Sequence, residues 1–261
     1  MRKSPWGSLK MPESLRGRTA LITGAAQRLG LATALALAGE GVNIIVHYRT
    51  SVTEAETLRA LLLARGVRAW LVTGDLTQPE EYETLIERAA AVAGPFDILV
   101  NNASIFPPDS LETMTLAQLT ENIELNAWAP FTLGRAFARR VGQGSIVNFL
   151  DARLPGYDWK HVSYMLSKQL LAVLTRMMAL EYAPRITVNA VAPGLILPPP
   201  GKDESYLEPL EALVPLRRHG KAEDIGAAVV YLLQNSYLTG QVICVDGGRH
   251  LKEPTDGSYP D

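Results

Sequence analysis

The sequence predicts a doubly wound α/β fold, in which helices cover both faces of a parallel sheet. Short β-branched runs alternate with longer amphipathic stretches, as in a chain of βα units. The runs are apolar throughout rather than at every second residue, which is typical of strands buried on both faces. With 261 residues, 47% of them hydrophobic, the chain can form one large core.

Seven apolar runs are the predicted strands. They are TALIT (19–23), NIIVHY (43–48), RAWLVT (68–73), FDILVNN (96–102), GSIVNFL (144–150), RITVNAVAP (185–193) and QVICVDGG (241–248). Helical patterns separate them, for example over about 53–65 and 79–93. The alternation therefore continues along the chain without a break that would mark a second domain.

A single cofactor-binding catalytic domain is predicted over 16–250, between an N-terminal tail (1–15) and a C-terminal tail (251–261). Within it, 197–212 begins with a Pro-rich stretch that follows a predicted strand. In such folds this position lies over the carboxyl edge of the sheet, where ligands bind. We expect a small substrate lid there; the alternative is an ordinary surface loop.

Charge and composition exclude several classes of function. Lys plus Arg is 25 and Asp plus Glu is 27, a net charge of −2, which gives no electrostatic basis for binding nucleic acid or an anionic membrane. The single cysteine, Cys244, excludes an internal disulfide, and four histidines without zinc-site spacing predict no metal. The opening residues lack the apolar segment of a signal peptide, and no apolar run approaches 18 residues. We therefore expect a cytoplasmic protein.

The segment TGAAQRLG (23–30) follows the first predicted strand and opens the first helix. Gly24 allows a tight turn, and Gly30 allows the helix to pack closely on the sheet. The helix start at Arg28 and Leu29 offers free N–H groups and a positive dipole end to a pyrophosphate. Glycine spacing alone is a weak signal, but its place after the first strand favours a dinucleotide site.

The end of the second predicted strand indicates which dinucleotide binds. It reads His47, Tyr48, Arg49, Thr50 and Ser51, with no acid before Glu54. An NAD site favours a carboxylate here, whereas a 2′-phosphate is repelled by one and attracted by guanidinium groups such as those of Arg28 and Arg49. The pattern therefore favours NADP over NAD; the alternative is that both arginines are solvated surface residues.

Tyr164 and Lys168 lie four residues apart in a predicted helix, so their side chains share one face. A free tyrosine has a pKa of about 10, too high for easy proton exchange near neutrality. A nearby ammonium group favours the phenolate, so we expect Lys168 to lower the pKa of Tyr164 and make it an acid–base catalyst.

These motifs, taken in order, resemble the short-chain dehydrogenase/reductase family over about 18–250. The matching pieces are TGAAQRLG, Asp75-Leu76, Asn101-Asn102-Ala103, Asn126, Tyr164-x-x-x-Lys168, Pro193-Gly194 and Val245-Asp246-Gly247-Gly248. The resemblance implies a Rossmann-type fold and a homotetramer. It implies that Asp75 contacts adenine and that Lys168 holds the nicotinamide ribose and, with Asn126, supports a proton relay to Tyr164. It also assigns further residues to the cofactor site: Leu76, Asn102, Ala103, Ser104, Pro193, Gly194 and Leu195.

Two departures from the common family pattern are informative. The middle glycine of the nucleotide turn is Arg28 here, and the catalytic serine, about 13 positions before the tyrosine, is Asp151. An ionised aspartate cannot donate a hydrogen bond to a carbonyl, and its charge repels a developing alkoxide. Asp151 therefore argues against ordinary ketone reduction and suits a nitrogen heterocycle that presents N–H donors; the alternative is a polar residue left by loss of activity.

Both departures, together with NNASIF (101–106), WKHVSYMLSK (159–168), PGLIL (193–197) and DGGRHL (246–251), resemble the pteridine reductase branch. By that resemblance Phe106 stacks on the flat pterin ring opposite the nicotinamide, unless it is a plain hydrophobic loop residue. Ser104 would hydrogen-bond the pterin or a cofactor phosphate. The substrate contacts expected are thus Ser104, Phe106, Asp151 and Tyr164.

The predicted activity is NADPH-dependent reduction of a dihydropterin to a tetrahydropterin, with dihydrofolate as a possible further substrate. Hydride would reach a ring carbon of a C=N bond, and Tyr164 and Asp151 would supply or relay the proton. For Asp151 to act as an acid, its pKa must rise well above about 3.9 through burial. The alternatives are an NADPH-dependent carbonyl reductase of the 3-oxoacyl type and a non-catalytic NADPH-binding sensor or scaffold.

Overall fold

The computed structural model describes residues 13–252 and contains one seven-stranded parallel sheet in the order β3-β2-β1-β4-β5-β6-β7. The strands are β1 (Thr19–Ile22), β2 (Asn43–Tyr48), β3 (Ala69–Thr73), β4 (Ile98–Asn101), β5 (Gly144–Phe149), β6 (Ile186–Pro193) and β7 (Val242–Val245). Each strand falls within its predicted run, so the doubly wound α/β prediction is confirmed.

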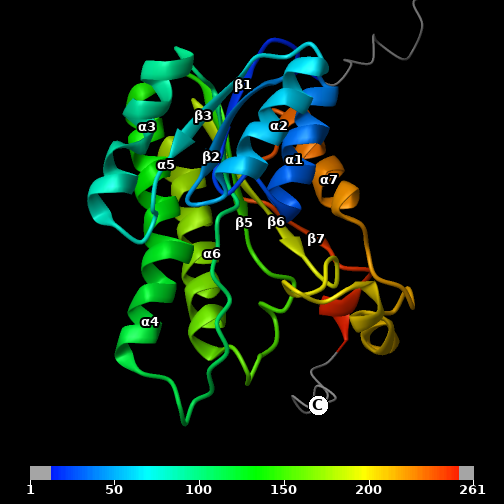
Figure 1. Ribbon diagram of the computed structural model, residues 1–261. Coiled ribbons are helices and arrows are strands. Elements are labelled where there is room, and N and C mark those ends of the chain that lie inside the picture. Colours follow the sequence, from blue (N-terminus) through cyan, green and yellow to red (C-terminus); the bar gives the residue numbers. More distant parts are fainter. Residues whose placement is uncertain (1–12, 253–261) are drawn as a thin grey trace, which may run out of the picture.

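Helices form a layer on each face of this sheet (Figure 1). One layer holds α1 (Arg28–Gly39), α2 (Val52–Ala64) and α7 (Ala222–Gln234); the other holds α3 (Pro79–Ala93), α5 (Ala129–Arg140) and α6 (Val162–Tyr182), with α4 (Leu116–Ile123) beside α6. Between α4 and α5 the chain makes one π-helical turn, η1 (Glu124–Trp128). Three short 3-10 helices follow later: η2 (Glu204–Tyr206), η3 (Glu208–Leu213) and η4 (Arg249–Leu251).

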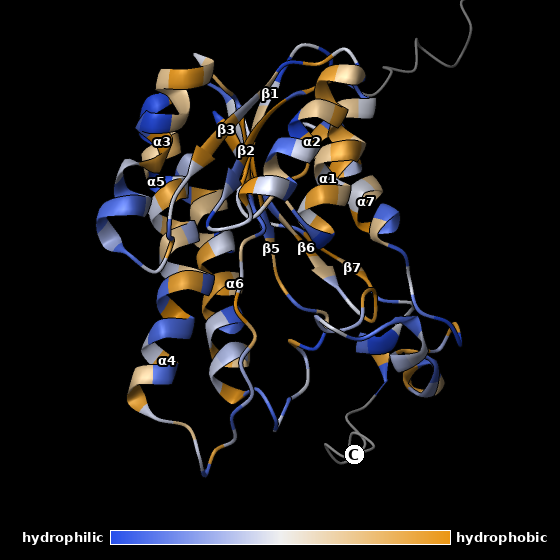
Figure 2. Ribbon diagram, in the orientation of Figure 1, coloured by the Kyte–Doolittle hydropathy of each residue, from blue (hydrophilic) through white to orange (hydrophobic). Residues whose placement is uncertain are grey.

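The core has one large apolar cluster on each side of the sheet, because the strands carry hydrophobic side chains on both faces. Ile44 and Leu37 are fully buried on the side of α1, and Leu99 and Phe137 on the side of α5. Hydrophobic residues dominate the central strands and the helical turns packed on them (Figure 2). This two-sided burial is the reason why the strand sequences do not alternate between apolar and polar residues.

The predicted domain limits need one adjustment. Leu15, placed in the N-terminal tail by the sequence, is buried in the core, and the Glu13 N–H donates a hydrogen bond to the Gln234 carbonyl. The packed domain therefore begins by residue 13, because burial of the apolar Leu15 side chain next to the first strand stabilises the fold. The remaining parts of the two predicted tails, 1–12 and 253–261, lie outside the described residues.

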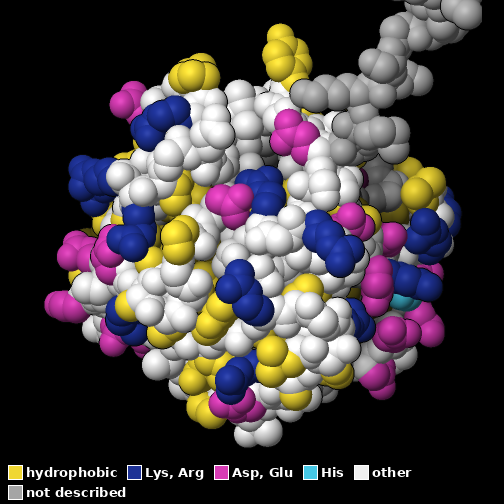
Figure 3. All heavy atoms as spheres, turned by 90° about the horizontal axis from the view of Figure 1, so that it is seen from above, with side chains coloured by type: hydrophobic (Ala, Val, Ile, Leu, Met, Phe, Trp, Pro, Cys, Tyr) yellow, Lys and Arg dark blue, Asp and Glu magenta, His cyan; other side chains and the backbone are white. Residues whose placement is uncertain are grey.

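Within 13–252, no helix is long and apolar enough to cross a membrane. On the face seen in Figure 3, basic and acidic side chains are interspersed with apolar ones and do not gather by sign.

Candidate active site

A cleft of about 270 Å³ lies at the carboxyl ends of the strands, where the sheet order places β1 beside β4. This reversal of strand order is the usual ligand position in doubly wound folds, because the loops from the two halves diverge there. The cleft brings together predicted residues from every part of the chain: Arg28, Leu29, Asn102, Ser104, Phe106, Asp151, Tyr164, Lys168, Pro193 and Gly194. The predicted catalytic, substrate and cofactor residues named here therefore line one cleft.

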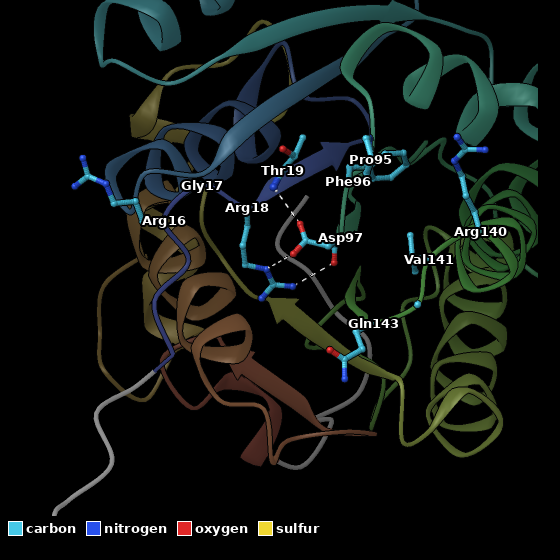
Figure 4. Close-up of a pocket in the computed structure, with 11 residues that line it drawn as sticks. Arg16, Gly17, Arg18, Thr19, Pro95, Phe96, Asp97, Arg140, Val141 and Gln143 are labelled. Atoms are coloured by element: carbon cyan, nitrogen blue, oxygen red, sulfur yellow. Dashed lines mark hydrogen bonds and ion pairs between the residues drawn. The ribbon is translucent and has the colours of Figure 1, made fainter.

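A larger hollow, of about 810 Å³, opens at the opposite edge of the sheet and is lined by the segments that precede β1, β4 and β5 (Figure 4). Two of its half-buried side chains, Arg18 and Asp97, bind each other. Arg18 Nε donates to Asp97 Oδ2 over 2.6 Å, and the Thr19 N–H donates to Asp97 Oδ1 over 3.1 Å. These bonds tie the start of β1 to the start of β4, so this hollow has a structural explanation.

Two glycines in the nucleotide turn are required by close contacts. A Cβ on Gly30 would lie 2.2 Å from the Gly24 carbonyl oxygen and 2.9 Å from Ala25 Cα, and Gly24 has a φ of +61°. The Asn102 amide closes the turn by donating to the Thr23 and Gly24 carbonyls over 2.9 and 3.0 Å. The turn therefore brings bare backbone to the start of α1, as a pyrophosphate site requires.

Arg28 keeps the backbone conformation of the glycine it replaces, with a φ of +53°. Its guanidinium is exposed and donates to the Pro198 carbonyl over 2.8 Å, which joins the turn to the start of the Pro-rich segment. The side chain of Gln27 does not cap α1, and the first turn of this helix has no acidic residue. The N–H groups at this helix end are therefore suitable for an anion.

His47 does not lie on the cofactor edge, as the sequence suggested, but beneath it. Its buried ring accepts the Gly24 N–H at Nδ1 over 3.2 Å, so Nε2 carries the proton and donates to the Gly74 carbonyl over 3.1 Å. Burial lowers the pKa of His47 to about 4, which keeps the ring neutral. Side chains alternate between the two faces of β2, and that of His47 points toward the nucleotide turn, where it binds the Gly24 N–H.

The exposed part of this edge is formed by Arg49 and Thr50, with Ser51 and Tyr48 half-buried beside them. Arg49 Nη1 lies 3.9 Å from Asp75 Oδ1, and Asp75 also accepts the Thr77 N–H and hydroxyl. Leu76 is buried under it. In the parallel sheet β2 lies next to β1, so Arg49 and Arg28 stand at neighbouring strand ends.

Tyr164 and Lys168 face the cleft from α6, one turn apart, and both are buried. The Lys168 ammonium donates to the Phe149 carbonyl over 2.8 Å and lies 5.7 Å from the centre of the Tyr164 ring. The expected pKa effect is wrong for this state: burial and the charge of Asp151 raise the pKa of Tyr164 well above its usual value. Burial also lowers the pKa of Lys168 to about 8. Because its pKa is raised, the Tyr164 phenol stays protonated near neutral pH and can donate a proton.

Asp151 lies at the reacting end of the cleft, where its Oδ2 accepts the Tyr164 hydroxyl over 3.0 Å. Arg153 binds the same carboxylate with both arms: Nε donates to Oδ1 over 2.9 Å and Nη2 to Oδ2 over 2.8 Å. Burial raises the pKa of Asp151, but the charge and hydrogen bonds of Arg153 lower it more, so the net shift is downward. A raised pKa, the condition for Asp151 to act as an acid, is therefore not met, because Arg153 opposes the effect of burial.

Phe106 lies at the mouth of the cleft with almost half of its side chain exposed. The His161 ring stacks on it at 3.7 Å between centroids, and the Tyr164 ring meets it edge-on at 4.6 Å. The Arg153 guanidinium lies 5.2 Å from its centroid and also pairs with buried Asp158. From the sequence, a place for Arg153 or His161 in this pocket was an open alternative, and Asp158 was not predicted, although Asp158-x-x-His161 places opposite charges close together.

Asn126 lies on the π-helical turn η1 and is fully buried. Its Oδ1 accepts the Ser104 hydroxyl and the Ile105 N–H, both over 2.9 Å, and its Nδ2 donates to Ser167 Oγ over 3.0 Å. The side chain thus fixes the loop that carries Phe106 against α6, and these bonds do not reach Lys168. Its role in a proton relay stays a prediction, as does the contact of Ser104 with a ligand.

The fold and this site define a dinucleotide-dependent oxidoreductase of the doubly wound α/β class. The profile of the family described as enoyl-(acyl carrier protein) reductase matches residues 24–250. The chain belongs to the short-chain dehydrogenase/reductase family. Members of this family use NAD or NADP, which agrees with the predicted nicotinamide cofactor.

Two kinds of reductase are found among the relatives. Pteridine reductase 1 of Leishmania tarentolae is 35% identical over 286 residues, covering 92% of this chain and 99% of that protein. The 3-oxoacyl-[acyl-carrier-protein] reductase of Synechocystis is 32% identical over 242 residues, covering 90% and 98%. A crystal structure of FolM alternative dihydrofolate reductase 1 from Brucella canis, complexed with NADP, has a TM-score of 0.86 and 32% identity, covering 93% of this chain and 98% of that one. The predicted resemblance to the pteridine reductase branch is confirmed.

Proposed function

We propose that this protein reduces a dihydropterin to a tetrahydropterin with NADPH. The observation that carries the proposal is the Asp151 carboxylate, which accepts the Tyr164 hydroxyl in a cleft flanked by Phe106. A buried carboxylate beside an aromatic ring suits a flat heterocycle with N–H donors, and it does not suit a carbonyl oxygen that becomes an alkoxide. The similarity to pteridine reductase 1 and to FolM supports the same substrate class.

Different side chains would stack on the substrate, accept its hydrogen bonds and donate the proton. Phe106 supplies a stacking face, and Asp151, held ionised by Arg153, accepts N–H groups of the heterocycle. Tyr164 donates the proton that the reduced C=N nitrogen requires, because its phenol stays protonated in this site. The Lys168 ammonium lies near enough to stabilise the phenolate that remains.

NADPH, when bound, supplies the hydride. The α1 end of the turn, with Gly24, Leu29 and Gly30, would hold the pyrophosphate, and Arg28 with Arg49-Thr50-Ser51 would hold the 2′-phosphate. The other predicted cofactor contacts are Tyr48, Asp75, Leu76, Asn102, Ala103, Ser104, Tyr164, Lys168, Pro193, Gly194 and Leu195. The fit is supported by the bare backbone at Gly24 and Gly30 beside the uncapped start of α1, and by Gly194, which lines the cleft without a side chain. The segment 197–212, whose Leu197 lines the same cleft, would act as the lid.

The direct test is consumption of NADPH by the purified protein with a panel of substrates. We expect turnover with dihydrobiopterin or dihydromonapterin, and the panel should include dihydrofolate and a 3-oxoacyl thioester. Good turnover of the thioester with none of any pterin would replace this proposal with carbonyl reduction, which the 32% identity to a 3-oxoacyl reductase keeps as the second candidate. Tight NADPH binding without turnover would favour a sensor or scaffold.

Replacing Arg28 with glycine should separate backbone strain from cofactor choice. Arg28→Gly relieves a left-handed φ worth about 1 kcal/mol, but it also adds similar freedom to the unfolded chain, so Tm should change little. Loss of one charge-assisted contact should cut the preference for NADPH over NADH about tenfold or more. The Kd values for NADPH and NADH, measured by fluorescence titration, check this. An unchanged ratio would show that Arg28 makes no contact with the 2′-phosphate.

We also propose a homo-oligomer, with the family's tetramer as the expected form. Leu166, Val173, Met177 and Leu180 are exposed on one stripe of α6, at spacings that share a helix face. Such an apolar stripe is typical of an interface between subunits. Light scattering at micromolar concentration should give a mass near four chains, and Met177→Glu should lower it. A monomeric wild-type protein would contradict the proposal.

A further inference from the structure

Phe106 is a loop residue between β4 and α4, and a loop by itself does not fix the plane of a ring. Its side chain is 47% exposed at the mouth of the cleft. A half-exposed aromatic side chain has rotational freedom that a stacking ligand must remove, and this ordering reduces affinity. A ring that serves as a stacking face therefore binds more tightly if neighbouring side chains already hold it in place.

The imidazole of His161 lies almost parallel to the Phe106 ring. Their centroids are 3.7 Å apart and their planes differ by 16°. The Tyr164 ring meets the edge of Phe106 at 4.6 Å, which restricts its movement within the plane. Phe106 lines the cleft, whereas His161 is absent from the described residues that line it. The imidazole therefore supports Phe106 from behind, and the face toward the cleft is left for a flat ligand.

His161 is itself held by a buried carboxylate. Its Nδ1 donates to Asp158 Oδ2 over 2.9 Å, and Asp158 is almost fully buried. The Lys160 N–H donates to Asp158 Oδ1 over 2.9 Å, and Arg153 Nη1 donates to the same Oδ2 as the imidazole. The Arg153 guanidinium also lies 5.2 Å from the Phe106 centroid. Asp158 thus fixes the imidazole, and the imidazole fixes the plane of Phe106.

We infer that His161 is a positioning residue, whose ring holds Phe106 in the plane on which a flat substrate stacks. The inference rests on the proposed function for the identity of the substrate, but the support of one ring by the other is a property of the chain alone. His161 acts through Phe106 and does not touch the reacting atoms. It should therefore change the affinity for flat ligands and leave proton donation by Tyr164 unaltered.

Two substitutions separate the ring of His161 from its hydrogen bond. His161→Phe keeps a flat ring beside Phe106 but cannot donate to Asp158, whereas His161→Asn keeps a donor and has no ring. The Kd of pterin is measured by fluorescence on protein loaded with oxidised NADP, which cannot supply a hydride. We expect binding about fivefold weaker in His161→Asn and within about twofold of wild type in His161→Phe. The reverse order would show that only the bond to Asp158 matters, and would overturn the inference.

Steady-state kinetics give a second readout. In His161→Asn the KM for a dihydropterin should rise about fivefold while kcat stays within about twofold, because the groups that carry out the chemistry are unchanged. General damage to the start of α6, three residues before Tyr164, would instead lower kcat and the affinity for NADPH. A fall in kcat at constant KM would contradict the positioning role. Trp159→Ala removes an exposed ring packed on Tyr157 and is the matched control, which should change neither constant.

The support of Phe106 can also be measured without a substrate. The chain has five phenylalanines, so fluorophenylalanine labelling gives a simple fluorine NMR spectrum in which Phe106→Leu identifies the resonance of residue 106. We expect this resonance to sharpen in His161→Asn, as the ring gains freedom, and to stay broad in His161→Phe and Trp159→Ala. An unchanged linewidth in His161→Asn would overturn the inference whatever the substrate is. Failure of the wild-type protein to bind pterin would refute the proposed substrate alone.

Discussion

Asp151→Asn should reduce turnover of a dihydropterin by roughly 100-fold or more while leaving the Kd for NADPH nearly unchanged. The amide keeps the size of the side chain but loses the charge and one of the two acceptor oxygens that face Tyr164 and the substrate. Removing a preorganised group of this kind costs about 100- to 1000-fold in other enzymes. Steady-state rates with dihydrobiopterin, and NADPH titration of the same preparation, provide the measurement.

Asp151→Ser is the control that separates substrate class from general damage. It restores the hydroxyl found at this place in the common family pattern, so it should lose pterin turnover as Asp151→Asn does. Unlike the ionised carboxylate of Asp151, the serine hydroxyl can turn its proton toward a carbonyl oxygen, and we expect reduction of a 3-oxoacyl thioester to appear or increase. If Asp151→Asn retains most pterin turnover, the carboxylate is not the group that defines the substrate.

Sequence patterns were sufficient for the fold because its causes are local. Every strand lies within its predicted run, since continuous apolar segments bounded by helices can be buried only between two helical layers. The glycines of the nucleotide turn were predictable for a similar reason. At Gly30 a side chain would collide with the backbone of Gly24 and Ala25, so glycine is required by residues close to it in the sequence.

The electrostatics of the site could not be predicted in the same way, because they depend on which charges meet in space. The pKa of Asp151 moves opposite to the expectation from burial alone, since Arg153 turns back onto it from two residues away. The pKa of Tyr164 rises because burial and the charge of Asp151 together outweigh the opposing charge of Arg153. His47 shows the same limit: its position in the strand was clear, but its two hydrogen bonds depend on Gly24 and Gly74.

These charges determine the expected pH dependence. Asp151 has a lowered pKa, so it stays ionised throughout the neutral range and adds no step there. Lys168, with a pKa of about 8, is charged below that pH and loses its proton above it. If the cation stabilises the phenolate of Tyr164, kcat should be level from about pH 6 to 7.5 and fall as the pH rises through about 8. A rate that instead increases steadily as the pH falls from about 7.5 to 6 would identify Asp151 as the acid.

Two substitutions assign this profile to its groups. Tyr164→Phe removes the proton donor and should lower kcat by about 100- to 10,000-fold at every pH, because no other described hydroxyl takes its place on Asp151. Lys168→Arg keeps a cation whose pKa exceeds about 12, so whatever activity survives should lose the decline above pH 8. A profile that still falls near pH 8 in Lys168→Arg would show that another group titrates there. The pair of Tyr164 and Lys168 would then not be the source of the pH dependence, and the role of Lys168 would be reduced to its hydrogen bond with Phe149.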